Sequence, residues 1–319
     1  MGVRSRPDSG PAASAHGAIH KCGLWFLRVL TFLAFAVCTV APWTYTFVTD
    51  VCGCTPKTPE GHRSRGRFLA RFTAFLWYIA LRFCFWLELD LEGLAPLDAA
   101  GRSSRQVFVA MNHTSYMDTA LICTLAPWRL VGDLKTLMAR AHMKLPILGR
   151  LARAVGHLPV PYTSRKAWDF AIDKERMAQV MQQVDDHVRA GGHLVVFPEG
   201  DLNREWHVLK QFRAGGMEIC IRHDMEVWGW LIVGSATTWP ADAPLGGVPA
   251  KIQHRAFLIY ISAREAAERL AGADAPLAEQ AKALASNAHS AMQAVLDEML
   301  AGKASLCRLK PPDSHGQVR

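Results

Sequence analysis

The chain has 319 residues, half of them hydrophobic, so it can bury the core of one large domain or of two smaller ones. This composition excludes an intrinsically disordered chain. Lysine and arginine total 36 against 28 aspartate and glutamate, and the net charge of +8 favours membrane surfaces, nucleic acid or phosphorylated molecules as partners.

The eight cysteines are spread along the chain without the spacing of a disulfide framework. Cys52 and Cys54 lie close together, but a zinc ribbon would need a second such pair. We therefore expect reduced thiols and no structural metal.

The first apolar segment, residues 29–49, has no charged side chain and is about as long as one crossing of a bilayer. Trp43 and Tyr45 are placed to lie at a membrane interface. A secretory signal peptide is the alternative, but the run is too long and no small-residue cleavage site follows before Pro42. Because Pro42 kinks a helix, a bent or re-entrant segment stays open.

A second apolar segment, residues 68–87, contains Arg71 and Arg82. On a helix these two arginines form one stripe with Arg67 and Tyr78, which suits a helix in the membrane plane with its cations at lipid phosphates. A buried helix whose arginines extend to the surface is the alternative. Basic residues flank both segments, so a hairpin entering and leaving on one face fits as well as two crossings.

From residue 87 the sequence alternates between short apolar runs and helical patterns, beginning with the strand-like alternation of residues 87–92. Such alternation predicts an α/β fold: a mostly parallel sheet flanked by helices, preceded by an amino-terminal membrane-associated helical hairpin. The expected strands are 87–92, 106–111, 136–140, 157–160, 193–197, 226–233 and 256–261, and the expected helices are 116–126, 146–155, 165–190, 214–222 and 276–301.

The long helix has cap candidates in Thr163 and Ser164. We expect a flexible N-terminus at 1–22, membrane-associated helical segments at 23–86, the α/β domain at 87–304 and a C-terminal tail at 305–319.

The first candidate site is where an apolar strand ends at Asn112-His113 and a helix begins near Asp118. Five positions on one helix would turn these side chains about 140° apart, so they can meet only if His113 lies on the turn before the helix. The carboxylate would then orient the imidazole, leaving Nε2 as general base for a hydroxyl. Taken alone, His113 and Asp118 could equally be a surface histidine and an aspartate that caps the following helix. Ser115 lacks the nucleophile elbow of a hydrolase.

The second candidate site follows the buried strand 193–197, which delivers Glu199 and Gly200 at its carboxyl end, the usual position of ligand groups in such a sheet. Gly200 permits a tight backbone approach, and Arg204 is a cation available to a phosphorylated substrate. Taken alone, the segment also fits a solvated basic loop.

Together, NHTSYMD at residues 112–118 and FPEG at 197–200 resemble the NHxSxxD and FPEG motifs of the glycerolipid acyltransferases, which include lysophosphatidic acid acyltransferase. Residues 142–149 and 156–160 are similar to that family's middle block, in the same order. The resemblance covers roughly residues 87–261, and it implies that 87–304 is an acyltransferase domain.

The resemblance implies transfer of a fatty acyl group from acyl-CoA or acyl carrier protein to a lysophospholipid hydroxyl, above all that of 1-acylglycerol-3-phosphate. His113 and Asp118 would be the catalytic dyad, and Glu199, Gly200 and Arg204 would bind substrate. No metal or bound cofactor is expected, the acyl donor being a co-substrate.

The expected partners are membrane lipids, acyl-CoA and the lysophospholipid acceptor, and nucleic acid is not expected. The expected location is the endoplasmic reticulum or another internal membrane, with the active site facing the cytosol.

One departure concerns the acceptor. The family commonly continues FPEG with Thr-Arg-Ser, whereas here Leu202 stands at the position of that arginine. Arg204 is two residues further and would share its face in an extended segment. Another lysophospholipid or glycerol 3-phosphate therefore stays open as acceptor, and so does a lipid-binding protein without turnover.

Overall fold

In the computed structural model, residues 11–166 and 169–302 are described. The helices are α1 (Pro11–Val51), α2 (Pro59–Phe83), η1 (Glu92–Leu94), α3 (Leu97–Ala100), α4 (Met117–Leu125), α5 (Trp128–Val131), η2 (His142–Lys144), α6 (Pro146–Val155), α7 (Lys174–Arg189), α8 (Gly215–His223), α9 (Ser235–Thr238), α10 (Ala263–Ala271) and α11 (Leu277–Leu300). The strands are β1 (Leu87–Asp90), β2 (Val107–Met111), β3 (Leu134–Ala139), β4 (Leu158–Val160), β5 (Tyr162–Lys166), β6 (Asp169–Ile172), β7 (His193–Val196), β8 (Glu226–Val233) and β9 (Ala250–Tyr260).

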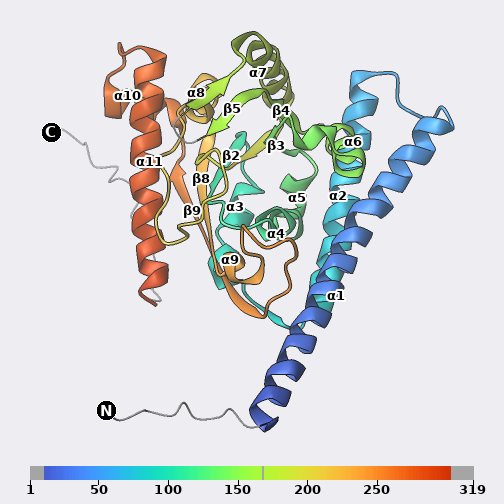
Figure 1. Cartoon of the computed structure of the whole chain (residues 1–319). Coiled ribbons are helices and arrows are strands. Elements are labelled where there is room, and N and C mark those ends of the chain that lie inside the picture. The colour runs from blue at the N-terminus through green and yellow to red at the C-terminus, as the bar shows by residue number, and fades with distance from the viewer. Residues whose placement is uncertain (1–10, 167–168, 303–319) are drawn as a thin grey trace, which may run out of the picture.

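The core is a seven-stranded sheet in the order β1-β9-β8-β2-β7-β3-β4 (Figure 1). All neighbours are parallel except β8 and β9, so the predicted mostly parallel sheet is confirmed. The order places β2 in the centre, between β8 and β7. The carboxyl ends of β2 and β7 therefore lie side by side, and each carries one of the two sequence motifs.

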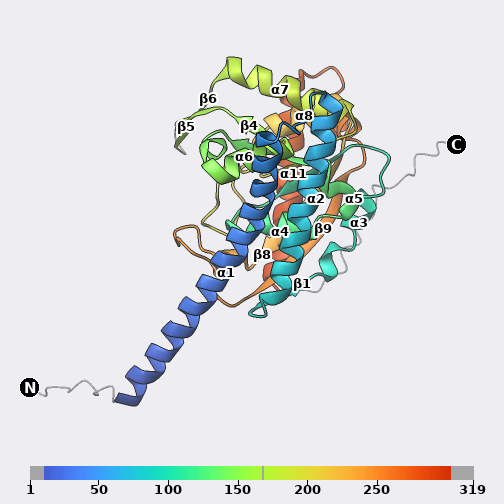
Figure 2. The ribbon, with the colours of Figure 1, turned by 90° about the vertical axis from the view of Figure 1, so that its right-hand side faces the viewer.

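Both faces of the sheet are covered by helices, which is why β2 is a continuous apolar run. Its alternate side chains enter two separate cores. Phe108 and Ala110 pack in the core shared with α7, α8, α10 and α11, whereas Val107, Val109 and Met111 pack in the core shared with α2 and α4. Figures 1 and 2 show these two helical layers on opposite sides of the sheet.

The amino-terminal hairpin consists of α1 and α2, which run antiparallel along one side of the domain (Figure 1). Helix α1 begins at Pro11, so part of the segment 1–22 predicted as flexible is helical, in keeping with its alanine-rich sequence. Residues 1–10 and 303–319, where the rest of that segment and the predicted tail fall, lie outside the described residues.

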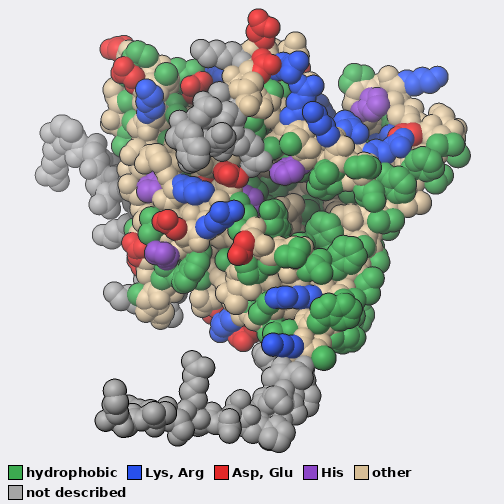
Figure 3. Space-filling view, in the orientation of Figure 1, with side chains coloured by type: hydrophobic (Ala, Val, Ile, Leu, Met, Phe, Trp, Pro, Cys, Tyr) green, Lys and Arg blue, Asp and Glu red, His purple; other side chains and the backbone are tan. Residues whose placement is uncertain are grey.

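One stretch among the described residues, Lys21–Val51 of α1, is long and apolar enough to cross a membrane by length and composition. Figure 3 shows hydrophobic side chains gathered on the side of the molecule formed by the hairpin. The exposed members include Trp25, Phe26, Phe32, Leu33 and Val37 on α1 and Phe75, Ile79 and Phe83 on α2.

The arginines of α2 are not all directed away from the domain. Arg67 Nε lies 2.7 Å from a carboxylate oxygen of Asp133, and the Arg71 guanidinium lies 5.9 Å from the ring centre of Trp128. Both partners belong to the α/β domain. Arg67 and Arg71 of the predicted basic stripe therefore also bind α2 to that domain.

The structure differs from the predicted elements between residues 162 and 190. A hairpin of β5 and β6 occupies the start of the expected long helix, and α7 begins at Lys174 with Asp173, not Thr163 or Ser164, as its cap. The Asp173 carboxylate accepts a hydrogen bond from the Arg176 N–H, which satisfies a first-turn donor. Strand β9 also starts earlier than expected, and α10 follows it.

Candidate active site

The site begins where β2 ends, and Asn112 fixes the exit of the strand. Its side chain exchanges two hydrogen bonds with the backbone of Ile232 on β8: Oδ1 accepts from the Ile232 N–H and Nδ2 donates to the Ile232 carbonyl, each at 2.8 Å. The Asn112 side chain thus forms the hydrogen bonds that one more residue of the β2–β8 ladder would form, while its own backbone turns away from the sheet. These two bonds fix the position of the next residue, His113.

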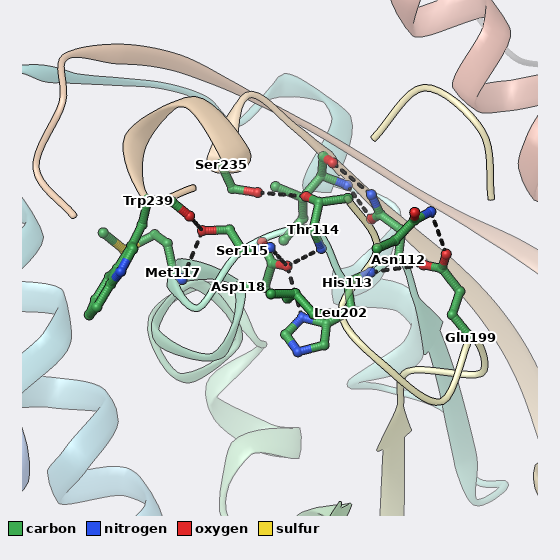
Figure 4. Close-up of polar contacts among 12 residues, drawn as sticks. Asn112, His113, Thr114, Ser115, Met117, Asp118, Glu199, Leu202, Ser235 and Trp239 are labelled. Carbon is green, nitrogen blue, oxygen red and sulfur yellow. Dashed lines mark hydrogen bonds and ion pairs between the residues drawn. The ribbon is translucent and has the colours of Figure 1, made fainter. Parts of the chain in front are cut away.

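His113 and Asp118 meet as the sequence predicts, because His113 lies on the turn before α4 and Asp118 lies in the first turn of that helix. His113 Nδ1 lies 3.1 Å from Asp118 Oδ2. The same oxygen accepts the backbone N–H groups of Thr114 and Ser115 at 2.8 and 2.9 Å. Asp118 is fully buried and therefore closes the turn and orients the imidazole at once (Figure 4).

The other ring nitrogen of His113, Nε2, has no hydrogen-bond partner among the described residues. The side chain is 19% exposed, and its ring stacks on Phe197 with 4.0 Å between centroids. Phe197 is the first residue of the FPEG motif, so the two motifs meet through this stacking. The geometry leaves an oriented imidazole with one nitrogen free to accept a proton.

Glu199 is buried, and both of its carboxylate oxygens are used inside the protein. Oε1 accepts the backbone N–H of His113 at 3.0 Å, and Oε2 accepts Asn203 Nδ2 at 2.7 Å and the backbone N–H of Lys210 at 2.9 Å. Burial raises the pKa of Glu199 above its ordinary value, and these hydrogen bonds oppose the rise. The contacts give Glu199 a structural role, since it holds the loop against the turn of residues 112–116, here called the catalytic turn because it carries the candidate base His113.

The loop after Glu199 passes directly beside His113. Gly200 has a left-handed φ of 81°, and the backbone N–H of Asn203 donates to the His113 carbonyl at 2.6 Å. Leu202, which stands at the position of the family's arginine, is therefore adjacent to His113 (Figure 4). Arg204 is exposed and forms no hydrogen bond or ion pair with any described residue, which leaves its guanidinium available.

An aromatic contact joins the catalytic turn to the hairpin, and no motif or periodicity in the sequence indicates it. Ser115 Oγ donates to the carbonyl of Trp239 at 2.7 Å, so Ser115 is engaged in holding the turn. The Trp239 ring contacts Tyr116 and Phe35, each with 5.8 Å between ring centroids. Phe35 belongs to α1, so the candidate membrane helix lies one side chain away from the catalytic turn.

A metal site is not found in the described part of the chain, where no three histidine, cysteine or acidic residues are grouped to hold an ion. What the fold and the site define is an α/β domain with a partly exposed histidine at a strand end and a buried aspartate that orients its ring.

The sequence comparison names the class more closely. Residues 92–233 match the model of the Acyltransferase family, and this range contains both motifs. Residues 92–233 are thus similar to an acyltransferase domain, in agreement with the two motifs at residues 112–118 and 197–200. No curated protein sequence matches the chain significantly.

Among solved structures, the 1-acyl-sn-glycerophosphate (LPA) acyltransferase PlsC of Thermotoga maritima is similar to this chain, with a TM-score of 0.57 and 14% sequence identity. The match covers 88% of this chain and 98% of that protein. At this identity the similarity establishes the fold.

Proposed function

We propose that this protein is a membrane-bound O-acyltransferase that moves a fatty acyl group from acyl-CoA or acyl carrier protein to the hydroxyl of a lysophospholipid. The acceptor that we propose first is 1-acylglycerol-3-phosphate, which would give phosphatidate. The observation that carries the proposal is the His113–Asp118 pair, with Nδ1 fixed by a buried carboxylate and Nε2 free.

In the proposed reaction, His113 Nε2 takes the proton of the acceptor hydroxyl while that oxygen attacks the carbonyl carbon of the thioester. Asp118 stabilises the imidazolium that forms. The tetrahedral intermediate then collapses, the carbon–sulfur bond breaks, and the thiolate receives the proton from His113. Because a thiolate is a good leaving group, this route needs no acyl-enzyme and no residue of the chain acting as nucleophile.

The hairpin supports a membrane setting for this chemistry. Its exposed apolar side chains can enter a bilayer, and the contact from Phe35 through Trp239 brings α1 to the catalytic turn. We propose that the acceptor lipid arrives from the membrane beside α1 and that the acyl donor arrives from the aqueous side, in the cytosol.

Acyl transfer by the detergent-solubilised protein tests the proposal. Labelled palmitoyl-CoA or oleoyl-CoA is offered with lysophosphatidate, other lysophospholipids or glycerol 3-phosphate, and acyl carrier protein serves as a second donor. We expect transfer to lysophosphatidate and a loss of about 10²- to 10⁴-fold in His113→Ala. His223→Ala is the matched control, since His223 also pairs with an aspartate, Asp185 at 2.7 Å, outside the site.

The acceptor panel also separates the alternatives. Transfer to another lysophospholipid or to glycerol 3-phosphate alone would change the proposed acceptor and keep the reaction class. A folded protein that binds lysophospholipid but transfers no acyl group from either donor would contradict the enzyme and favour a lipid-binding role.

A further inference from the structure

The two carboxylate oxygens of Asp118 have very different surroundings. Oδ2 accepts three hydrogen bonds, whereas Oδ1 is buried and has no hydrogen-bond partner among the described residues. A buried carboxylate oxygen without a donor is costly and therefore rare in folded proteins. We therefore expect a hydrogen-bond donor to Asp118 Oδ1 in the core between the sheet and α4.

His254 on β9 is placed to supply that donor. It lies opposite Ile232 in the β8–β9 register, and Ile232 is the residue held by the Asn112 side chain. His254 is therefore two strands from the end of β2, at the level of the catalytic turn. Its side chain shares a face with Ile252 and Ala256, which belong to the core that contains residues of α4.

The hydrogen bonding of His254 identifies which ring nitrogen carries the proton. Trp230 Nε1, which can only donate, lies 3.4 Å from His254 Nδ1. Nδ1 is thus the acceptor and Nε2 carries the hydrogen. That Nε2 is buried and has no acceptor among the described residues. One core therefore holds a buried donor without an acceptor and a buried acceptor without a donor.

The charges around His254 agree with this placement. Burial lowers the pKa of His254 to about 4, while the negative charges of Asp118 and of Asp90 on β1 act to raise it. His254 is therefore a neutral donor at physiological pH, and Asp118 is close enough for its charge to be felt.

We propose that His254 positions Asp118 through one buried water, which accepts the Nε2–H of His254 and donates to Asp118 Oδ1, so that His254, Asp118 and His113 form a hydrogen-bonded chain. This proposal rests on the proposed function for its catalytic consequence. The donor holds the carboxylate in the rotation that turns Oδ2 toward His113. His254 itself lies within the core and is a positioning residue.

Two substitutions of similar size distinguish a positioning role from a purely structural one. In His254→Gln the amide nitrogen can occupy the place of Nε2, whereas in His254→Asn the shorter amide occupies the place of Nδ1. We expect His254→Asn to lower kcat about tenfold, the value of one hydrogen bond to a charged group, with KM for both substrates within about twofold. We expect His254→Gln to retain kcat within about threefold. Circular dichroism and thermal unfolding verify that both variants fold.

Equal kcat values for both variants, whether at the wild-type level or lowered together, would overturn the proposal, because the donor at Nε2 would then make no difference. Nitrogen NMR of histidine-labelled protein gives a readout without turnover. We expect His254 to carry its proton on Nε2 and the Nε2–H resonance to shift in Asp118→Asn. A proton on Nδ1, or an unmoved resonance, would refute the contact even if acyl transfer is observed. A wild-type protein inactive on every acceptor would refute the proposed function and leave the NMR result to decide on His254.

Discussion

Replacing Asp118 by asparagine tests the centre of the proposed site, because it removes one charge and almost no volume. With its amide oxygen in the place of Oδ2, the asparagine can still accept from the backbone N–H groups of Thr114 and Ser115 and from His113. The turn before α4 is therefore expected to keep its shape. What disappears is the negative charge beside the imidazole.

The size of the effect follows from the three contacts of Oδ2. A hydrogen bond to a charged group contributes about 1.5–3 kcal/mol and a neutral one about 1 kcal/mol, so the two backbone contacts together lose about 2 kcal/mol of unfolding free energy. At the third contact the imidazolium loses its counter-charge when His113 takes the proton. There we expect kcat to fall by about 10²- to 10⁴-fold, the range of general-base catalysis.

The assay is acyl transfer to the best acceptor at saturating donor, together with urea unfolding to measure stability. Asp133→Asn is the control, because Asp133 pairs with Arg67 away from the catalytic turn. A folded Asp118→Asn protein that retains kcat within about threefold of the wild type would refute the role of the carboxylate. Equal losses in the two variants would show a general effect of lost ion pairs.

Two further predictions concern stability and substrate. Burial and the charge of Lys135 lower the pKa of His187 from its ordinary 6.5 to about 4. Between pH 6.5 and pH 4 the protein therefore takes up a proton at His187 when it unfolds. The resulting stability, about 3 kcal/mol, is fully present above pH 6.5 and is lost as the pH falls toward 4. Urea unfolding across this range is expected to show a shallower pH dependence in His187→Gln than in the wild type or in His62→Gln, and an unchanged slope would contradict it. Arg204→Ala is expected to raise KM about tenfold for a phosphorylated acceptor with kcat unchanged, measured beside a monoacylglycerol that lacks the phosphate. An unaltered KM would show that the exposed guanidinium does not contact the acceptor.

The parts of the molecule that the sequence predicts best depend on local pattern. Buried β2 is apolar throughout because both of its faces are covered, and His113 with Asp118 fall within one turn, so five residues of sequence determine their contact. The location of Glu199 at a strand end follows from the same reasoning. Its structural contacts do not, because two of its three donors, Asn203 and Lys210, come from a loop that returns to it.

The parts that the sequence did not predict depend on contacts between distant segments. Asn112 binds Ile232 and Ser115 binds Trp239 across more than a hundred residues, and no periodicity indicates either contact. The β5–β6 hairpin lies where a helical pattern was expected, since pairing between the two strands outweighs helix propensity there. In the sequence His254 is an ordinary polar residue of a strand, and only its neighbours in the folded core indicate a role for it.

The aromatic contact between α1 and the catalytic turn has a consequence for how the enzyme can be divided. The Phe35 ring packs against Trp239, and the Trp239 carbonyl accepts a hydrogen bond from the Ser115 hydroxyl, so helix α1 helps to hold the turn that carries His113. A shortened chain that begins at β1 would retain every residue of both motifs. It would nevertheless lose the lateral support of the turn, and we expect such a chain to fold around its sheet yet turn over poorly. The amino-terminal helix α1 and the turn that carries His113 are thus packed as one unit.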